Sequence, residues 1–237
     1  MTDAAQHLID DVVSANHILY NEGVVDGFGH VTVRHDKRPD RFLIARSMAP
    51  GLVTADDIME CDLEGTPHDP AGRRTYVERF IHSAIYKARP DVIAVVHSHS
   101  PAIVPFSVTD ARLRPICHMC GFLGENTPVF EIRDIAGADS DLLIRSQAMG
   151  EALAKTLGSA AVALMRGHGS VTVGASVKQV VYRAIYAEVN AKLQSDAMRL
   201  GKINFLTPGE AATAAAMNDE HVDRPWQLWK MAAKRLQ

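Results

Sequence analysis

The spacing of apolar and polar residues along the chain predicts helices and strands in alternation. Apolar side chains recur at helical spacing from residue 4 to residue 22, and Gly23 then ends the pattern. The alternating segment 31–34 and the apolar run 41–46 both indicate strands. A short polar turn at residues 35–40 joins the two, so we expect an antiparallel hairpin.

The remainder of the chain continues in the same manner. Residues 47–74 contain several prolines and glycines, which predicts an irregular segment around a short strand at residues 58–63. A helix over residues 75–88 is stopped by Arg89-Pro90. The same criteria predict strands at 92–96, 128–132, 161–165 and 171–173, and helices at 140–157, 176–200 and 208–217.

This order of elements indicates the α/β class, with helices flanking a mixed but mainly antiparallel central sheet. The chain has 237 residues, a length that one large domain covers, and neither an internal repeat nor a low-complexity linker divides it. We therefore expect a single domain over residues 1–237. Its tail, residues 207–237, contains Trp226 and Trp229, which we expect to be covered by the same chain or by a neighbouring subunit.

Composition and charge exclude several classes of partner. The net charge is −3, so no basic surface is available for nucleic acid or an anionic membrane. No stretch approaches the ~20 apolar residues of a membrane span. The first residues lack the basic start and apolar centre of a signal peptide. Three cysteines provide no disulfide framework, and we therefore expect a location in the reducing cytoplasm.

Histidines that follow two apolar runs are the first candidates for chemistry. His97-Ser98-His99 comes directly after the run 92–96, and residues i and i+2 of a strand point to the same side. Two imidazoles held in this way suit one divalent metal. His168 follows the apolar run 161–165 in the same manner. Chance is the alternative explanation of His-x-His, since the chain contains 11 histidines.

Glu78 is the carboxylate that the sequence offers to this site. A glutamate at the start of a helix most often compensates the helix dipole. However, the helix at residues 75–88 leads directly into the strand of His97. If it packs antiparallel to that strand, its first turn lies beside His97 and His99. Glu78 would there be a fourth ligand or the acid/base of a metal-assisted reaction.

Taken together, these motifs resemble the class II aldolase/adducin family, over roughly residues 5–200. The resemblance rests on the segments 27–34, 52–58, 78–82, 89–99 and 167–169. It implies a three-layer α/β/α fold and a divalent metal on His97, His99 and His168. It implies Glu78 as the catalytic acid/base and sometimes as a ligand. It also implies a homo-oligomer, a tetramer or higher, with active sites at subunit boundaries.

The chain departs from the sugar-phosphate aldolases of this family at two positions. It has Gly29-His30 where they have Gly-Asn, and Tyr76-Val77 where they have two serines directly before the glutamate. The asparagine and serines of those enzymes hold a phosphate by hydrogen bonds. Tyr76 and Val77 make a bulkier and less polar wall. We therefore expect a flat aromatic acid as substrate in place of a phosphorylated sugar.

A narrower resemblance is to decarboxylases of hydroxylated aromatic dicarboxylates, such as dihydroxyphthalate and hydroxymethylpyridine-dicarboxylate decarboxylases. It rests on the segments 28–34, 46–50 and 76–82. Histidine and arginine side chains are available to hold the carboxylates, although for both arginines a structural ion pair is the alternative. The candidate catalytic residues are Glu78, His30 and Arg79, and the candidate substrate contacts are Arg46, Ser47, Tyr76 and His118.

The sequence is compatible with three functions. The first is a metal-dependent decarboxylase, and the second is a retro-aldol lyase acting on a small hydroxy-acid or sugar. Both break a carbon–carbon bond and leave charge on the retained fragment, which a metal stabilises. The third is a non-enzymatic assembly module like the adducins, which the presence of Glu78 and all three histidines disfavours. The donors suit Zn²⁺, Mn²⁺, Fe²⁺ or Co²⁺.

Overall fold

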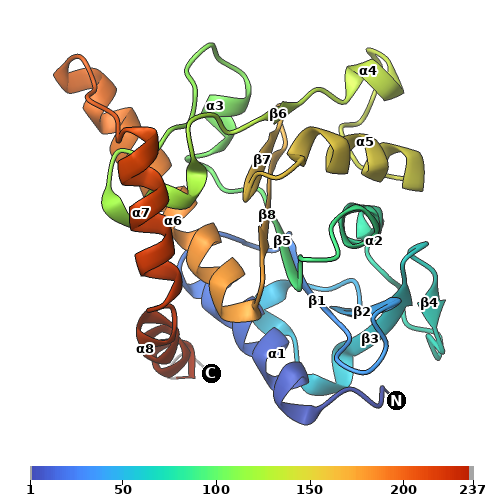
Figure 1. Ribbon diagram of the computed structural model, residues 1–237. Coiled ribbons are helices and arrows are strands. Elements are labelled where there is room, and N and C mark those ends of the chain that lie inside the picture. Colours follow the sequence, from blue (N-terminus) through green and yellow to red (C-terminus); the bar gives the residue numbers. More distant parts are fainter. Residues whose placement is uncertain (1, 235–237) are drawn as a thin grey trace.

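A computed structural model of the chain describes residues 2–234, and eight strands of this part form one sheet (Figure 1). The strands are β1 (His30–Arg34), β2 (Arg41–Ala45), β3 (Ile58–Asp62), β4 (Pro67–His68), β5 (Ala94–Ser98), β6 (Val129–Phe130), β7 (Val162–Met165) and β8 (Gly169–Gly174). Their order across the sheet is β4-β3-β2-β1-β5-β8-β7-β6. Only the β6–β7 pair is parallel. The predicted sheet type and the β1–β2 hairpin are therefore confirmed.

Helices cover both faces of this sheet and give three layers, as predicted (Figure 1). The helices are α1 (Gln6–Asn21), α2 (Arg79–Ala88), α3 (Val104–Ser107), α4 (Arg133–Ala136), α5 (Gln147–Leu157), α6 (Val177–Leu200), α7 (Pro208–Asp219) and α8 (Asp223–Lys234). Short 3₁₀ turns are η1 (Pro50–Leu52), η2 (Ala55–Asp57) and η3 (His118–Leu123). Helices α1, α6 and α8 pack on one face, and α2 and α5 pack on the other. No helix within residues 2–234 is long and apolar enough to cross a membrane.

The alternation of side chains along β1 decides which residues reach the chemistry. Val31 and Val33 are buried in the core that the sheet forms with α1 and α6. His30 and Thr32 therefore point to the opposite face, which α2 covers. The same face receives His97, because β1 and β5 pair antiparallel with His30 opposite His97. The central strands thus carry a row of polar side chains toward α2.

Several predicted elements differ from the structure at their ends. The helix predicted from residue 75 begins at Arg79, because Tyr76 is held in the preceding turn by a hydrogen bond from its hydroxyl to the carbonyl oxygen of Met48 (2.5 Å). The helix predicted from residue 140 begins at Gln147, where Ser146 caps it. The strand predicted over 128–132 is reduced to two residues.

The tail folds into two helices, and its tryptophans are covered within the chain. Trp226 and Trp229 of α8 are 1% and 9% exposed, and they belong to the core formed with α1 and α6. A neighbouring subunit is therefore not needed to bury them. A subunit contact made by the outer surface of this tail stays a prediction.

Candidate metal centre

Four side chains converge at the end of β5, on the face covered by α2. Glu78, His97, His99 and His168 each offer one ligand atom, and these atoms lie within 4.8 Å of one another. The Nε2 atom of His99 lies 3.2 Å from that of His97 and 3.0 Å from that of His168. Oε2 of Glu78 lies 3.4 Å and 3.5 Å from the same atoms of His97 and His168. Ligand atoms around a tetrahedral metal lie about 3.4 Å apart, so this group could hold one ion.

Backbone carbonyl groups orient two of these rings. Nδ1 of His97 lies 3.1 Å from the carbonyl oxygen of Ser170, and Nδ1 of His168 lies 2.9 Å from that of Leu142. A carbonyl oxygen only accepts, so each Nδ1 carries the proton and each Nε2 presents a lone pair. Lone pairs that face one another at 3 Å have no proton to share. The donor set therefore fits a divalent cation better than an internal hydrogen-bond network.

The close pairing of β5 and β8 brings His168 to the other histidines. Gly169 lies against the backbone of β5, where an added Cβ would meet the carbonyl oxygen of Ser98 at 2.0 Å. Gly167 adopts a φ of +63°, which turns the chain sharply between β7 and β8. The two glycines on either side of His168 therefore permit the turn and the close approach that place its ring beside His99.

Glu78 lies in the turn directly before α2 and is buried. Its Oε1 accepts a hydrogen bond from the backbone N–H of Ile144 at 2.9 Å. Burial raises the pKa of Glu78, but the adjacent imidazoles of His97 and His168 outweigh it and hold this pKa below its usual range. Glu78 is therefore an ionised carboxylate, with Oε1 fixed and Oε2 directed to the histidines.

A pocket of about 430 Å³ opens beside the cluster. Its walls are largely apolar or aromatic and include Phe28, Tyr76 and Val77. The exposed ring of Phe28 lies 6.1 Å from the ring of His99. Ser47 lines the pocket, and His30 does so too. No lysine or arginine of the described residues lines it. The volume suits a small planar acid.

A chain of buried hydrogen bonds lies behind His30. Nδ1 of His30 is 2.6 Å from Nε2 of His82, and Nδ1 of His82 is 2.7 Å from the hydroxyl of Thr32. That hydroxyl is 2.8 Å from the hydroxyl of Tyr86. Burial lowers the pKa of His82 to about 3 and that of His30 well below its usual value, so both rings are neutral at pH 7.

Sequence reasoning missed the roles of His82, Thr32 and Tyr86 in this chain. Two signals were present. His82 and Tyr86 are spaced four residues apart along α2, and Thr32 is two residues from His30 along β1. Residues at these spacings share one face of a helix or a strand.

The structure does not bring the two candidate arginines into this pocket. Arg79 is the first residue of α2, directly after Glu78, and its side chain points away from the pocket. Its Nε donates to the carbonyl oxygen of Gly65 at 2.6 Å. Its guanidinium lies over the ring of Phe80. Nε of Arg46 donates to Oδ1 of Asp57 at 2.6 Å, the structural ion pair that was the alternative. Within one chain, neither arginine is placed to hold the substrate.

His118 also lies outside the pocket of Glu78. It begins η3 and borders a separate hollow with Tyr182 and His221. Its backbone carbonyl accepts a hydrogen bond from Asn218 of α7 at 3.0 Å. The packing of η3 on α7 decides this position, and no periodicity in the sequence indicates it.

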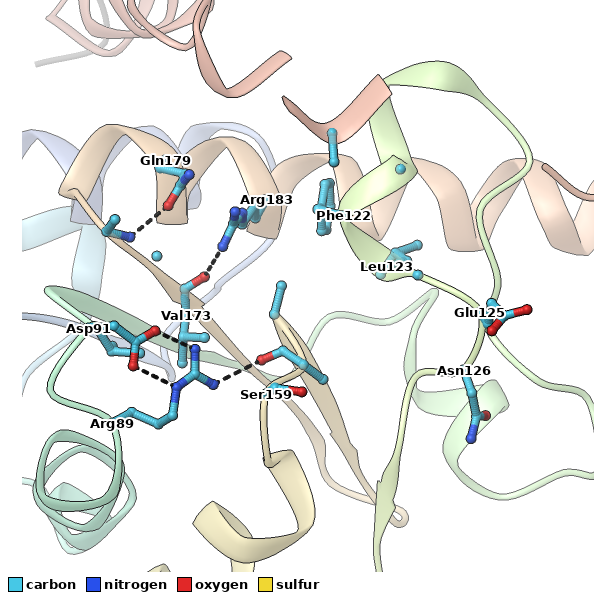
Figure 2. Close-up of a pocket in the computed structure, with 18 residues that line it drawn as sticks. Arg89, Asp91, Phe122, Leu123, Glu125, Asn126, Ser159, Val173, Gln179 and Arg183 are labelled. Carbon is cyan, nitrogen blue, oxygen red and sulfur yellow. Dashed lines mark hydrogen bonds and ion pairs between the residues drawn. The ribbon is translucent and has the colours of Figure 1, made fainter. Parts of the chain in front are cut away.

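A separate pocket of about 600 Å³ lies at the opposite ends of the central strands (Figure 2). Arg89 and Arg183 border it, but both are engaged within the chain. Arg89 donates to both carboxylate oxygens of Asp91, at 2.8 Å and 2.7 Å. Arg183 donates to the carbonyl oxygen of Val173 at 3.0 Å. It also donates to Asp219 at 3.0 Å. These arginines therefore stabilise the loops around the pocket and leave little charge for an anionic ligand.

Known proteins resemble this chain over most of its length. Residues 10–195 match the Class II Aldolase and Adducin N-terminal domain. Decarboxylase tropJ of Talaromyces stipitatus is 38% identical over 92% of this chain and 90% of that protein. The 3,4-dihydroxyphthalate decarboxylase of Arthrobacter keyseri is 27% identical over 77% of this chain and 75% of that protein. The L-fuculose 1-phosphate aldolase structure from Glaciozyma antarctica PI12 has a TM-score of 0.79 at 25% identity, covering 98% of this chain and 90% of that one.

Proposed function

Since the chain belongs to the class II aldolase and adducin family, we propose that it is a divalent-metal-dependent carbon–carbon lyase that decarboxylates a hydroxylated aromatic dicarboxylate. The substrate is of the phthalate or pyridine type. The observation that carries this proposal is the cluster of Glu78 and three histidines beside a pocket with aromatic walls. The names of the two related decarboxylases support the reaction and, for one of them, the substrate class.

The metal would be held by His97, His99 and His168, with Glu78 beside it. Such a donor set suits Zn²⁺, Mn²⁺, Fe²⁺ or Co²⁺. When bound, the ion supplies Lewis-acid stabilisation of negative charge on a substrate oxygen. The ring orientations set by the Ser170 and Leu142 carbonyls keep the Nε2 lone pairs available to it.

In this scheme, Glu78 first accepts a proton from the substrate and then donates it back. As a carboxylate, it accepts the proton of the ring hydroxyl beside the carboxylate that is lost. Glu78 then delivers this proton to the ring carbon that bears the carboxylate, which converts the ring to its ketone form. The bond to that carboxylate breaks, CO₂ leaves, and the electron pair returns to the ring and its oxygen, so that the product leaves as the phenolate.

The other pocket residues bind and orient the ring. Tyr76 and Phe28 offer aromatic faces against which a planar substrate stacks. The hydroxyl of Ser47 and the ring of His30 are the polar groups that fix its oxygens. Because the walls are largely apolar, water is displaced when the ring enters, which strengthens each polar contact.

Retro-aldol cleavage of a hydroxy-acid or sugar is the second candidate function. The fold similarity to an L-fuculose 1-phosphate aldolase favours it. Against a phosphorylated substrate stand Tyr76 and Val77, which offer fewer hydrogen bonds than a serine pair.

A homo-oligomer in the cytoplasm completes the proposal. At a subunit boundary, His118 and Arg46 of one chain would contact the substrate bound in the pocket of its neighbour. Light scattering on the purified protein measures the assembly, and a monomer would remove this part of the proposal.

The reaction is tested by the products formed from a substrate panel. Protein purified without chelator is analysed for metal and incubated with hydroxyphthalates, hydroxypyridine dicarboxylates and aldol substrates. The proposal expects CO₂ and a ring with one carboxylate fewer. Release of an aldehyde from an aldol substrate, with no CO₂ from any aromatic acid, would establish the second candidate.

A further inference from the structure

The hydrogen-bonded chain behind His30 has a preferred direction. Tyr86 has one proton to donate and two acceptors in reach, the hydroxyl of Thr32 at 2.8 Å and the carbonyl oxygen of Ile93 at 3.4 Å. The shorter contact is the better hydrogen bond, so Tyr86 donates to Thr32. The proton of Thr32 then goes to Nδ1 of His82, which lies 2.7 Å away.

This direction decides the tautomer of both histidines. His82 accepts at Nδ1, so its single proton is on Nε2 and is donated to Nδ1 of His30. His30 consequently carries its own proton on Nε2. No hydrogen bond from the described residues engages that nitrogen, while the ring of His30 lines the pocket.

We propose that Tyr86, Thr32 and His82 are positioning residues that hold His30 as the Nε2–H tautomer, with its proton available to an oxygen of the substrate. This inference rests on the proposed function for the identity of that substrate, an aromatic acid. His30 then donates to a carboxylate or ring oxygen that gains charge during the reaction.

The burial of the chain gives the tautomer its stability. Thr32, His82 and Tyr86 are at most 1% exposed, so water does not replace any of these hydrogen bonds. The reversed direction would leave Tyr86 with only the 3.4 Å contact to Ile93. It would also present a bare Nε2 lone pair of His30 to an acidic substrate, which is repulsive. Both effects favour the same tautomer.

Nuclear magnetic resonance of ¹⁵N-histidine-labelled, Zn²⁺-loaded protein tests the assignment without turnover, and the His30→Gln variant identifies the His30 signals. In the wild type, we expect His30 to have an unprotonated Nδ1 and a protonated Nε2. We expect a mixture of tautomers in Tyr86→Phe and in Thr32→Val. Thr127→Val is the matched control, because Thr127 is buried and its hydroxyl has no described partner. Protonated Nδ1 in the wild type, or an unchanged tautomer in both chain variants, would overturn the proposal.

Kinetics then test the effect on the reaction. Tyr86→Phe and Thr32→Val should lower kcat on the aromatic acid about tenfold, since part of the population keeps the donor. KM and metal content should stay close to wild type. Unchanged kcat in both variants would remove the positioning role. If no aromatic acid is decarboxylated although His30 shows the expected tautomer, the proposed function fails and the tautomer assignment stands.

Discussion

The backbone N–H of Ile144 donates to Oε1 of Glu78 at 2.9 Å, and this bond ties the segment before α5 to the turn before α2. One carboxylate oxygen is thereby fixed on the protein. The other, Oε2, faces His97 and His168 at 3.4 Å and 3.5 Å. The geometry thus separates the two oxygens of Glu78 into one that holds the side chain and one that is free for chemistry.

Replacing Glu78 by glutamine should separate metal binding from turnover. The amide oxygen still accepts from Ile144, so the protein should fold and keep its metal. Because the glutamine side chain cannot take up the proton, kcat should fall by about 10²- to 10⁴-fold. Metal analysis and steady-state kinetics measure the two effects. Glu220→Gln, at an exposed position, is the control. Wild-type kcat in Glu78→Gln would remove Glu78 from the proton-transfer role.

Replacing His97, His99 or His168 singly by alanine should reduce the metal content of the purified protein. Each change removes one of three imidazole donors from a cluster that spans 4.8 Å. Elemental analysis of dialysed protein gives the stoichiometry. His68→Ala changes an exposed histidine on β4 and should keep the full amount. Equal metal content in all four variants would mean that the ion is bound elsewhere.

Acid should destabilise the metal-free protein through His82. Burial lowers its pKa from 6.5 to about 3, so between these values the unfolded chain binds the proton and the folded chain does not. Stability is therefore full above pH 6.5 and falls as the pH falls, by about 2 kcal/mol at pH 5. Urea unfolding at pH 7 and pH 5 measures the change, and His82→Gln should lose less stability between them. The same loss in that variant would show that other groups cause it.

Trp226→Ala should destabilise the chain by about 3–5 kcal/mol, because the indole is 1% exposed in the core beneath α8. Leu228→Ala on the same helix removes a side chain that is 60% exposed. It should change the free energy of unfolding by less than about 0.5 kcal/mol. Chemical denaturation compares the two. A small effect of Trp226→Ala would mean that α8 does not pack on the core in solution.

The sequence predicted the structure best where the regular spacing of side chains along one helix or strand determines it. The i, i+2 spacing of His97 and His99 predicted that both point to one side of a strand, and the step from helix to strand predicted that Glu78 lies near them. The position of Arg79 depends on where α2 begins, and a hydrogen bond between Tyr76 and Met48 decides that start. Such a contact joins residues 28 apart and leaves no periodic signal.

The central claim is a decarboxylation that needs a metal at the histidine cluster. It is tested most directly by measuring CO₂ from the best aromatic acid of the panel with metal-free protein, before and after addition of Zn²⁺, Mn²⁺, Fe²⁺ or Co²⁺. We predict negligible release without metal, recovery with at least one of these ions, and no recovery in His97→Ala. CO₂ release at the full rate from metal-free protein, or from metal-loaded His97→Ala, would contradict the account.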